Sequence, residues 1–380
     1  MVRNGIDCIE KYAHIFQGKR LGLITSISGV NQKLRSTVDI LSEKFHVTAL
    51  FAPEHGVRGD KAAGQIVGDD VDEHTKIPVY SLYRKDSRRL TPEMMANIDA
   101  VVYDIQDLGV RWYTFISTMY YAMQSCEEND REMVILDRPD PLGGKVEGNL
   151  LRKGQESFVG AYELCIRYGL TAGELANMIY EKSGYHFKLS VIPAEGWNHD
   201  MLFPDTGNIW VMPSLGIPRF DTALIYTGTC LFEGTNISEG RGTSVPFEIV
   251  GAPFVKADTF ASRMNGKKLP GVIFRPVFFT PSASKYKDTF CQGVQIHITD
   301  YKAFEAVKTG IVLLDELRNC YSEKFEFLPP YKEGHRSHME LLFGNRKLMD
   351  ENADIRTILE ECDQDSKMFA EIKSAYYIYR

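Results

Sequence analysis

The string FAPEHG at residues 51–56 places Glu54 and His55 directly after an apolar run. Pro53 ends the expected strand because proline has no amide proton to donate, and Gly56 permits a tight turn. A glutamate held at the end of a rigid strand, partly enclosed by apolar walls, is suited to general acid work, and His55 beside it to substrate binding. The alternative is a glutamate that only accepts hydrogen bonds from backbone amides of the turn.

A second polar string, YDIQDLGVR at residues 103–111, carries carboxylates, an amide and a guanidinium just after another expected strand. Planar polar groups bind sugars when aromatic rings lie beside them, and an aromatic cluster follows at once. The candidate substrate-binding residues here are Asp104, Gln106, Asp107, Arg111 and Tyr113. The alternative is an internal ion pair between Asp104 and Arg111 that only holds the loop.

Two further loops, at residues 136–148 and 233–243, add polar groups and glycines that allow a backbone to approach a ligand closely. Their candidate residues are Asp137, Arg138, Glu147, Asn236, Glu239 and Arg241. Each loop alone is a weak signal. Four polar loops that converge on one cleft favour a site for a carbohydrate or an acidic small molecule.

Several common signatures are missing. The sequence contains no G-x-x-x-x-G-K-[ST] string, no G-x-G-x-x-G after the first expected strand and no G-x-S-x-G elbow. An NAD, ATP or α/β-hydrolase site is therefore not indicated, and we expect no cofactor. His335 and His338 have the spacing of a helical metal pair, but no acidic partner stands at a recognised distance in sequence, so we expect a solvated helix start and no metal site.

The elements that must position these residues alternate between short apolar runs and longer amphipathic ones. This pattern predicts βαβ units around a mainly parallel, Rossmann-like sheet, whose ligands lie beyond the carboxyl ends of the strands. Strands are expected at residues 21–25, 47–52, 79–82, 100–105 and 133–136, and helices at 37–45, 92–98 and 113–128.

After about residue 150, short apolar runs and amphipathic runs alternate less regularly along the chain. Thr171 and Glu174 have capping-box spacing and predict a helix through about residue 182, with a strand at 188–192. Residues 197–253 are so rich in glycine and proline that we expect an ordered loop system without long elements. The tail predicts mixed α/β structure, with a strand at 293–298 and helices at 301–316, near 354–363 and from 365 onward.

Composition excludes several classes of protein. The chain has 380 residues, 44 Lys+Arg against 51 Asp+Glu and 44% hydrophobic residues, which is ordinary globular composition. No basic stripe indicates a nucleic-acid partner, and no apolar run approaches the length of a membrane span. The first residues lack the apolar core of a signal peptide, so we expect a cytoplasmic protein, unless a leader was removed. Seven widely spaced cysteines indicate reduced thiols.

The long strings in this chain resemble a bacterial family known as DUF1343 or YbbC-like, associated with exo-β-N-acetylmuramidases of the NamZ type (glycoside hydrolase family 171). The matching strings are FAPEHGVRG, YDIQDLGVRWYTFIST, VILDRPDPLGG with VEGN, SFVG with TAGELA, and LFEGTNISEGRGTSVPFEIVGAPF. They lie within residues 20–255, and the looser remainder agrees in length.

This resemblance implies a Rossmann-like N-terminal domain, which we place at residues 1–155, and a smaller α/β C-terminal domain at 156–380 that completes the cleft. It implies release of N-acetylmuramic acid from the non-reducing end of peptidoglycan fragments, in cell-wall turnover or recycling. Glu54 then corresponds to the principal catalytic carboxylate. For its partner we rank Glu147 ahead of Glu239 and Asp104.

The chain departs from the family pattern at Tyr168, where the string RYGLT stands in place of an expected RHGMT. A phenol donates a hydrogen bond but does not titrate near neutrality, so substrate preference or a proton relay is expected to differ. The carboxylate on the lactyl ether of muramic acid requires a cationic partner in the site. Arg58, Arg111 and Arg241 are the candidates for binding it.

The expected reaction is hydrolysis of a β-glycosidic bond, with Glu54 as the acid and a second carboxylate that assists water or attacks directly. Assistance from the acetamido group of the substrate is a third possibility. The rival interpretations are a glycosidase for another amino sugar and a non-catalytic muropeptide-binding protein, which would protect its ligand unchanged. The oligomeric state stays open.

Overall fold

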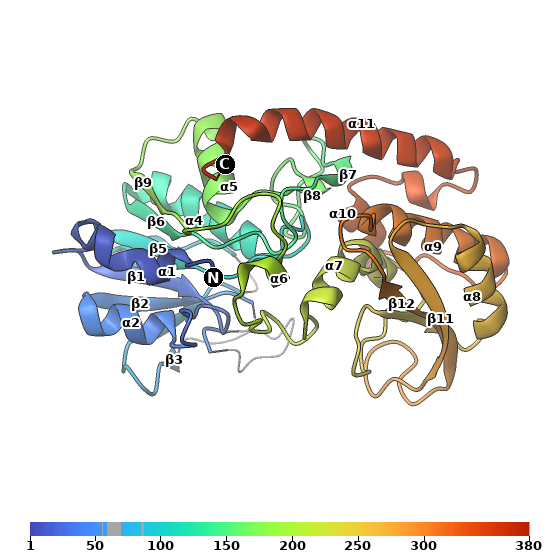
Figure 1. Ribbon diagram of the computed structural model, residues 1–380. Coiled ribbons are helices and arrows are strands. Elements are labelled where there is room, and N and C mark those ends of the chain that lie inside the picture. The colour runs from blue at the N-terminus through green and yellow to red at the C-terminus, as the bar shows by residue number, and fades with distance from the viewer. Residues whose placement is uncertain (55, 59–69, 85–86, 380) are drawn as a thin grey trace.

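The computed structural model describes residues 1–54, 56–58, 70–84 and 87–379, and its N-terminal domain is built on a seven-stranded sheet (Figure 1). All neighbouring strands pair in parallel except β3, which is antiparallel to β4. In sheet order the strands are β3 (Asp70–Val71), β4 (Pro78–Ser81), β2 (Val47–Ala52), β1 (Leu21–Thr25), β5 (Ala100–Asp104), β6 (Glu132–Leu136) and β9 (Leu189–Ile192). The predicted mainly parallel sheet is confirmed.

Both faces of this sheet are buried, because successive side chains of a strand point to opposite faces. Leu23 of β1 and Val102 of β5 lie in one apolar cluster, whereas Ile24 and Tyr103 lie in another. The first face is covered by α1 (Gly5–Cys8), the 3-10 helix η1 (Ile9–Ile15) and α2 (Thr37–Lys44). The second is covered by α3 (Pro92–Met95), α4 (Phe115–Asn129) and α5 (Ala172–Ser183).

The sheet has a topological switch point between β1 and β5. The chain leaves β1 towards β2 on one side and later returns to β5 on the other side. Ligand sites of open α/β sheets lie at such a crevice, beyond the carboxyl ends of the strands. The helix that follows Thr171 begins as predicted, because the Thr171 hydroxyl accepts from the Glu174 amide and the Glu174 carboxylate accepts from the Thr171 amide.

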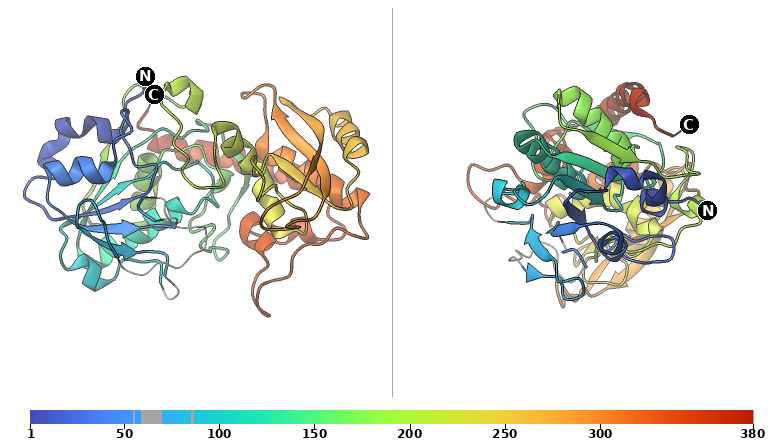
Figure 2. Two further views of the ribbon diagram at one scale, coloured as in Figure 1. Left: turned by 90° about the horizontal axis from the view of Figure 1, so that it is seen from below. Right: turned by 90° about the vertical axis from the view of Figure 1, so that its left-hand side faces the viewer.

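The C-terminal domain lies beside the N-terminal one and has an antiparallel three-stranded sheet with the order β10 (Ile249–Ala252), β12 (Cys291–Ile298) and β11 (Val272–Phe279) (Figure 2). A hairpin of β7 (Glu147–Leu150) and β8 (Cys165–Arg167) stands near the junction. The remaining helical elements are α6 (Phe203–Thr206), α7 (Phe220–Thr229), η2 (Cys230–Gly234), α8 (Ala257–Gly266), α9 (Ala306–Cys320), α10 (His338–Phe343), η3 (Lys347–Met349), α11 (Ile355–Lys373) and η4 (Ser374–Tyr376).

Two expectations about helices are wrong. The loop system predicted for residues 197–253 contains α7, a ten-residue helix in which every residue except Asp221 is buried. This helix therefore shows no continuous polar face in the sequence. The two helices predicted near residues 354–363 and from residue 365 onward are in fact one helix of 19 residues, α11 (Ile355–Lys373). It lies across both domains (Figure 1) and contacts β7 and α9.

The division predicted at residue 155 stays a prediction. The seventh strand of the N-terminal sheet, β9, lies at Leu189–Ile192 and pairs with β6, so this sheet includes chain from beyond that boundary. The two termini lie on the same side of the N-terminal domain (Figure 2), where Val2 and Tyr379 belong to one apolar cluster. Among the described residues, every helix is too short or too polar to pass through a bilayer.

Helices α7 and α9 approach closely through a pair of glycines. A Cβ atom added to Gly228 would lie 2.0 Å from the Ala306 carbonyl oxygen, and one added to Gly310 would lie 2.3 Å from the Gly228 carbonyl oxygen. Neither neighbour is a flexible side chain, so only a change in the helix packing would make room. Gly228 is therefore suited to this position in α7, because the absence of a side chain allows the close packing against α9.

We expect Gly310→Ala to lower the free energy of unfolding by about 2 kcal/mol, because the added methyl group forces the two helices apart. The matched control is Gly266→Ala at the end of α8, where no atom lies within 4 Å of the added Cβ. That control is expected to change stability by less than about 1 kcal/mol. Denaturant unfolding of both variants tests this, and equal losses would contradict the packing argument.

Candidate active site

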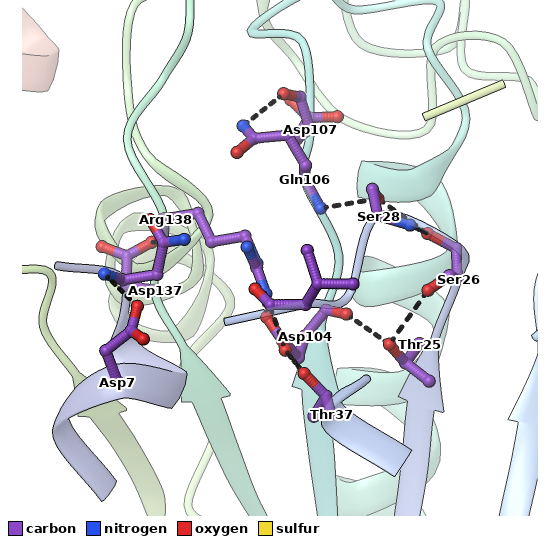
Figure 3. Close-up of polar contacts among 12 residues, drawn as sticks. Asp7, Thr25, Ser26, Ser28, Thr37, Asp104, Gln106, Asp107, Asp137 and Arg138 are labelled. Carbon is purple, nitrogen blue, oxygen red and sulfur yellow. Dashed lines mark hydrogen bonds and ion pairs between the residues drawn. The ribbon is translucent and has the colours of Figure 1, made fainter. Parts of the chain in front are cut away.

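The polar side chains that follow β1, β5 and β6 gather at the switch point but mostly bind one another (Figure 3). Arg138 donates from Nε to Asp104 Oδ1 over 2.6 Å and from Nη2 to Asp104 Oδ2 over 2.9 Å. Thr37 also donates to this carboxylate, and Asp104 is completely buried. The ion pair therefore joins the ends of β5 and β6, and the pair that the sequence suggested between Asp104 and Arg111 does not form.

Gln106 and Asp107 also serve the framework of this edge. Gln106 donates to the carbonyl oxygens of Asp107 and Pro139, over 2.9 and 3.0 Å. Asp107 accepts from the Tyr168 hydroxyl and, over 2.7 Å, from the Gly109 amide. Burial raises the pKa of Asp107 to about 6, against the lowering effect of these donors. Tyr168 is completely buried, so its phenol braces a loop and does not line the cavity described below.

Asp137 has a similar bracing role at the start of α5. Its carboxylate accepts from the Thr171 hydroxyl over 2.6 Å, from the Gly173 amide over 2.8 Å and from the Tyr379 hydroxyl over 2.5 Å. Burial raises the pKa of Asp137 to about 6. This carboxylate ties the sheet edge to a helix N-terminus and to the end of the chain.

Arg111 was expected to hold a substrate carboxylate, but its guanidinium is fully buried. It donates to the carbonyl oxygens of Asn149, Leu164 and Leu342, each within 2.9 Å, and so links the N-terminal domain to α10. Burial lowers the pKa of Arg111 to about 10. Complete burial and three backbone carbonyl partners leave this guanidinium without a surface open to a substrate.

Glu147, ranked first as the second catalytic carboxylate, lies at the junction between the domains. It accepts from Arg167 over 2.6 Å and from the Val307 amide over 3.1 Å. It does not belong to the lining of the cavity that contains Glu54. Its position indicates a structural ion pair that joins β7, β8 and the start of α9.

Arg58 and Asn236 also lie outside the lining of that cavity. Arg58 binds Asp72 over 2.5 Å and Asp39 over 3.2 Å. The Asn236 side chain donates to the Lys324 carbonyl over 2.7 Å and so joins two loops. His55 lies outside the described residues.

A cavity of about 390 Å³ at the junction of the domains contains Glu54. This volume is within the range of small-molecule sites, roughly 300–1,000 Å³. Two acidic side chains, Glu54 and Glu233, line it, the first from the turn after β2 and the second from η2. The other lining residues are Tyr83, Trp112, Tyr113, Thr114, Phe115, Phe158, Val159, Ser214, Leu215, Gly216, Ile217, Tyr226, Arg241, Phe247 and His338.

Glu54 is held by the residue that precedes α4. The Thr114 hydroxyl donates to Glu54 Oε2 over 2.9 Å. Glu54 is partly buried, in agreement with the partly enclosed strand-end glutamate that the sequence predicted. Its catalytic role stays a prediction.

Glu233 is the carboxylate that sequence reasoning missed. Arg241 donates to Glu233 Oε1 from Nε over 2.9 Å and from Nη2 over 2.6 Å, and His338 Nε2 lies 3.5 Å from Oε2. Burial alone would raise the pKa of Glu233, but His338 and Arg241 outweigh it and lower the pKa to about 2. Glu233 is therefore ionised at neutral pH.

The position of Glu239, another candidate, is behind the cavity wall and not in it. Its carboxylate is 2% exposed and lies 2.8 Å from Lys285 Nζ and 3.6 Å from Arg241 Nε. Only the second of these partners lines the cavity. Glu239 thus acts on the site through Arg241.

Buried aromatic side chains form part of the cavity lining. Tyr226 packs edge-on against Tyr113 and Phe247, with ring centroids 6.1 and 4.7 Å apart, and all three are buried. Leu215, by contrast, is 61% exposed and marks the mouth. Tyr113 thus lines the same cavity as Glu54 and Glu233, and its predicted role in substrate binding stays a prediction.

No group of three His, Cys, Asp or Glu side chains in the described part of the chain is arranged to hold a metal ion. His338, singled out for its spacing from His335, contacts Glu233 at the cavity. His335 packs against the Tyr331 ring, with centroids 5.0 Å apart.

Comparison with known proteins identifies the family. Residues 21–221 match the domain described as "Exo-beta-N-acetylmuramidase NamZ, N-terminal", and residues 224–379 match its C-terminal counterpart. The chain belongs to the NamZ family. The peptidoglycan beta-N-acetylmuramidase NamZ of Bacillus subtilis (strain 168) is 43% identical to it over 385 residues, which cover 100% of this chain and 91% of the relative. The resemblance inferred from the motifs is confirmed.

Two crystal structures of DUF1343 family proteins from Bacteroides fragilis NCTC 9343 have the same fold. The first has a TM-score of 0.91 and 35% identity, and the second a TM-score of 0.79 and 29% identity. Each comparison covers 100% of this chain and 99% of the other chain. The predicted fold class, two α/β domains with a mainly parallel N-terminal sheet, is confirmed.

One buried carboxyl group of this NamZ family chain has an unusual environment. Asp140, after β6, accepts from the Leu142 amide over 2.8 Å through Oδ1, while its buried Oδ2 has no hydrogen-bond partner in the structure. Gly109 packs against it so closely that an added Cβ would lie 2.3 Å from Oδ2. Burial raises the pKa of Asp140 to about 8, so the group is protonated at neutral pH.

This environment predicts a pH-dependent difference in stability between the protein and its Asp140→Asn variant. Because the folded state binds a proton that the unfolded chain releases near pH 4, the folded state loses stability as the pH rises towards 8. The asparagine side chain of the variant does not titrate, so the variant lacks this loss of stability. Its stability relative to the unaltered protein should therefore rise by about 2 kcal/mol between pH 6 and pH 8. Denaturant unfolding at both values measures this, and a pH-independent difference would refute it.

Proposed function

We propose that this NamZ family member is a glycoside hydrolase that releases N-acetylmuramic acid from the non-reducing end of peptidoglycan fragments. The observation that carries the proposal is that Glu54 and Glu233, from the two domains, line one cavity with aromatic walls. The related Bacillus subtilis protein, described as a peptidoglycan beta-N-acetylmuramidase, supports the choice of substrate.

In the proposed reaction, the bond between C1 of the sugar and the glycosidic oxygen breaks. Glu54 donates its proton to the departing oxygen, and a water molecule supplies the hydroxyl group that ends on C1. The other proton of this water passes to a carboxylate of the site, either the second carboxylate or the ionised Glu54. Positive charge develops on the ring as the bond breaks, so a fixed anion close to the ring stabilises the transition state.

Glu233 is suited to this second role, because Arg241 and His338 keep it ionised. It either activates the water molecule, attacks C1 directly or supports the acetamido group of the substrate. The configuration of the released sugar separates the first of these from the other two, because a single displacement inverts the anomeric centre. Glu147 and Glu239, the candidates from the sequence, do not line the cavity, so we place Glu233 ahead of both for this role.

The shape of the cavity supports exo action. Its lining includes the buried rings of Tyr113, Tyr226 and Phe247 as well as the exposed Leu215, and we infer from this contrast that the cavity is closed at the rings and open at Leu215. A glycan chain cannot continue past the closed end. The sugar at the non-reducing terminus therefore fits the cavity, and the leaving group points outward.

Of the three arginines named as partners of the lactyl carboxylate, only Arg241 belongs to the lining of this cavity. Its guanidinium lies over the Phe247 ring, 4.8 Å from the centroid, and faces Glu233. We assign the lactyl carboxylate to the outward side of Arg241, beside His338. The proposed partner is thus a small carbohydrate of peptidoglycan origin, in cell-wall turnover or recycling, and cell fractionation would test the expected cytoplasmic location.

We expect Glu54→Gln and Glu233→Gln each to lower kcat by at least about 100-fold on para-nitrophenyl β-N-acetylmuramic acid, because one removes the acid and the other the anion. Release of the chromophore measures this, with the N-acetylglucosamine analogue as the substrate control. A comparable loss in Glu147→Gln or Glu239→Gln would give the partner role to that residue.

Absence of cleavage of both substrates by the unaltered protein would contradict the proposed activity. A muropeptide that is bound but not consumed would then raise the melting temperature persistently, which identifies a binding protein. An enzyme instead consumes its ligand, so the stabilisation decays with time.

Arg241→Gln should weaken binding of N-acetylmuramic acid by about tenfold, because a charge-assisted hydrogen bond to the lactyl carboxylate is lost. Binding of N-acetylglucosamine, which has no lactyl group, should change much less. Calorimetric titration of both sugars measures the difference. Equal losses would show that Arg241 serves Glu233 alone.

A further inference from the structure

Behind the cavity, four charged side chains form a row of alternating sign: Glu233, Arg241, Glu239 and Lys285. Arg241 Nη2 lies 2.6 Å from Glu233 Oε1, Arg241 Nε lies 3.6 Å from Glu239 Oε1, and Lys285 Nζ lies 2.8 Å from Glu239 Oε2. Only the first two line the cavity. The row therefore leads from the site into the C-terminal domain.

Two carboxylates compete for one guanidinium in this row. Glu239 is 2% exposed, so its charge must be paired, and Arg241 is close enough to serve it. Arg241 nevertheless gives both of its short hydrogen bonds to Glu233, at 2.6 and 2.9 Å. This distribution is stable because Lys285 supplies Glu239 with a second cation at 2.8 Å.

Lys285 is held in place by its own contacts. Its ammonium group also donates to the carbonyl oxygens of Phe232 and Ile237, over 2.6 and 3.0 Å, so all three of its protons are used. Both carbonyls belong to the segment that carries Glu233 and Glu239. The ammonium thus ties this segment together from behind.

The loop between β11 and β12 is shaped to present this lysine. Ser284 and Tyr286, on either side of it, have φ values of +66° and +56°, a left-handed conformation that costs free energy for residues with a side chain. Ser282 holds the loop against the site segment by donating from its amide and its hydroxyl to the Gly242 carbonyl, each over 2.8 Å.

We propose that Lys285 is a positioning residue of the active site, which neutralises Glu239 so that Arg241 stays on Glu233. Lys285 does not line the cavity, and the proposed effect reaches the site through Glu239 and Arg241. The inference rests on the proposed function, because it takes Glu233 as the anion that the reaction needs.

Loss of this ammonium group changes the surroundings of Glu233 in a defined way. Arg241 turns towards Glu239, and Glu233 keeps the His338 ring, 3.5 Å away, as its remaining partner of the present pair. The other titratable groups that face Glu233 are Cys230 and Tyr226, which supply no positive charge. The pKa of Glu233 then rises, and the reaction loses its anion at a higher pH than before.

The test compares Lys285→Met with Lys287→Met, which removes the same charge from an exposed position in the same loop. We expect Lys285→Met to lower kcat about tenfold with little change in KM, and to move the acid limb of the kcat/KM profile up by about one pH unit. Lys287→Met should change neither. If Lys285→Met does not fold, Lys285→Gln, which can still bind the two carbonyls, replaces it.

A second substitution tests the route of the effect. Glu239→Gln added to Lys285→Met removes the competing carboxylate, so the double variant should regain most of the activity and the original acid limb. A structural role of Lys285 alone predicts additive losses instead. Additive losses, or an acid limb that does not move in the single variant, would overturn the inference.

A crystal structure of Lys285→Met gives a readout that does not depend on activity. Arg241 should leave Glu233 and approach Glu239. If Arg241 remains within 3 Å of Glu233, as it does here, the inference fails. If the unaltered protein cleaves neither sugar analogue, the proposed function fails, while the position of Arg241 still decides the inference about Lys285.

Discussion

The ion pair between Arg241 and Glu233 is the contact on which the candidate site depends. A carboxylate in a cavity walled by aromatic rings is costly to ionise unless a cation meets it there. Arg241 provides that cation with two short hydrogen bonds, and it is held in turn by the Phe247 ring and by Glu239. The row of charges behind the cavity exists because each buried charge needs a partner of opposite sign.

A second constraint is that the two carboxylates come from different domains. Glu54 follows a strand of the N-terminal sheet, whereas Glu233 belongs to η2 of the C-terminal part. Their distance is fixed only if the domains are fixed. Arg111 links the N-terminal domain to the carbonyl of Leu342, Glu147 accepts from the Val307 amide, and α11 lies across both domains (Figure 1). Glu147, predicted to be catalytic, and Arg111, predicted to bind substrate, thus join the two domains together with α11.

Much of the N-terminal fold could be predicted from sequence, because strands buried on both faces appear as short apolar runs that end in polar clusters. The strand at Val47–Ala52 and the capped start of α5 agree with the prediction to the residue. Helix α7 could not be predicted in this way. All of its residues except Asp221 are buried, so it lacks an amphipathic period. Its Gly228 suggests a break in the sequence, although this glycine permits close packing against α9.

The site residues show a similar limit. A polar residue at the end of a strand can bind a ligand or brace the strand ends, and both roles use the same residue types. Asp104 and Asp137 are completely buried and bound on all sides by their neighbours, whereas Glu54 lies in the lining of a cavity. Only packing separates these cases, since it decides which carboxylates keep access to a substrate. Glu233 stands in the polar string that also holds Glu239 and Arg241, and the residue types alone do not tell which of its two carboxylates faces a cavity. Only the fold brings His338, 105 residues away in the chain, to Glu233.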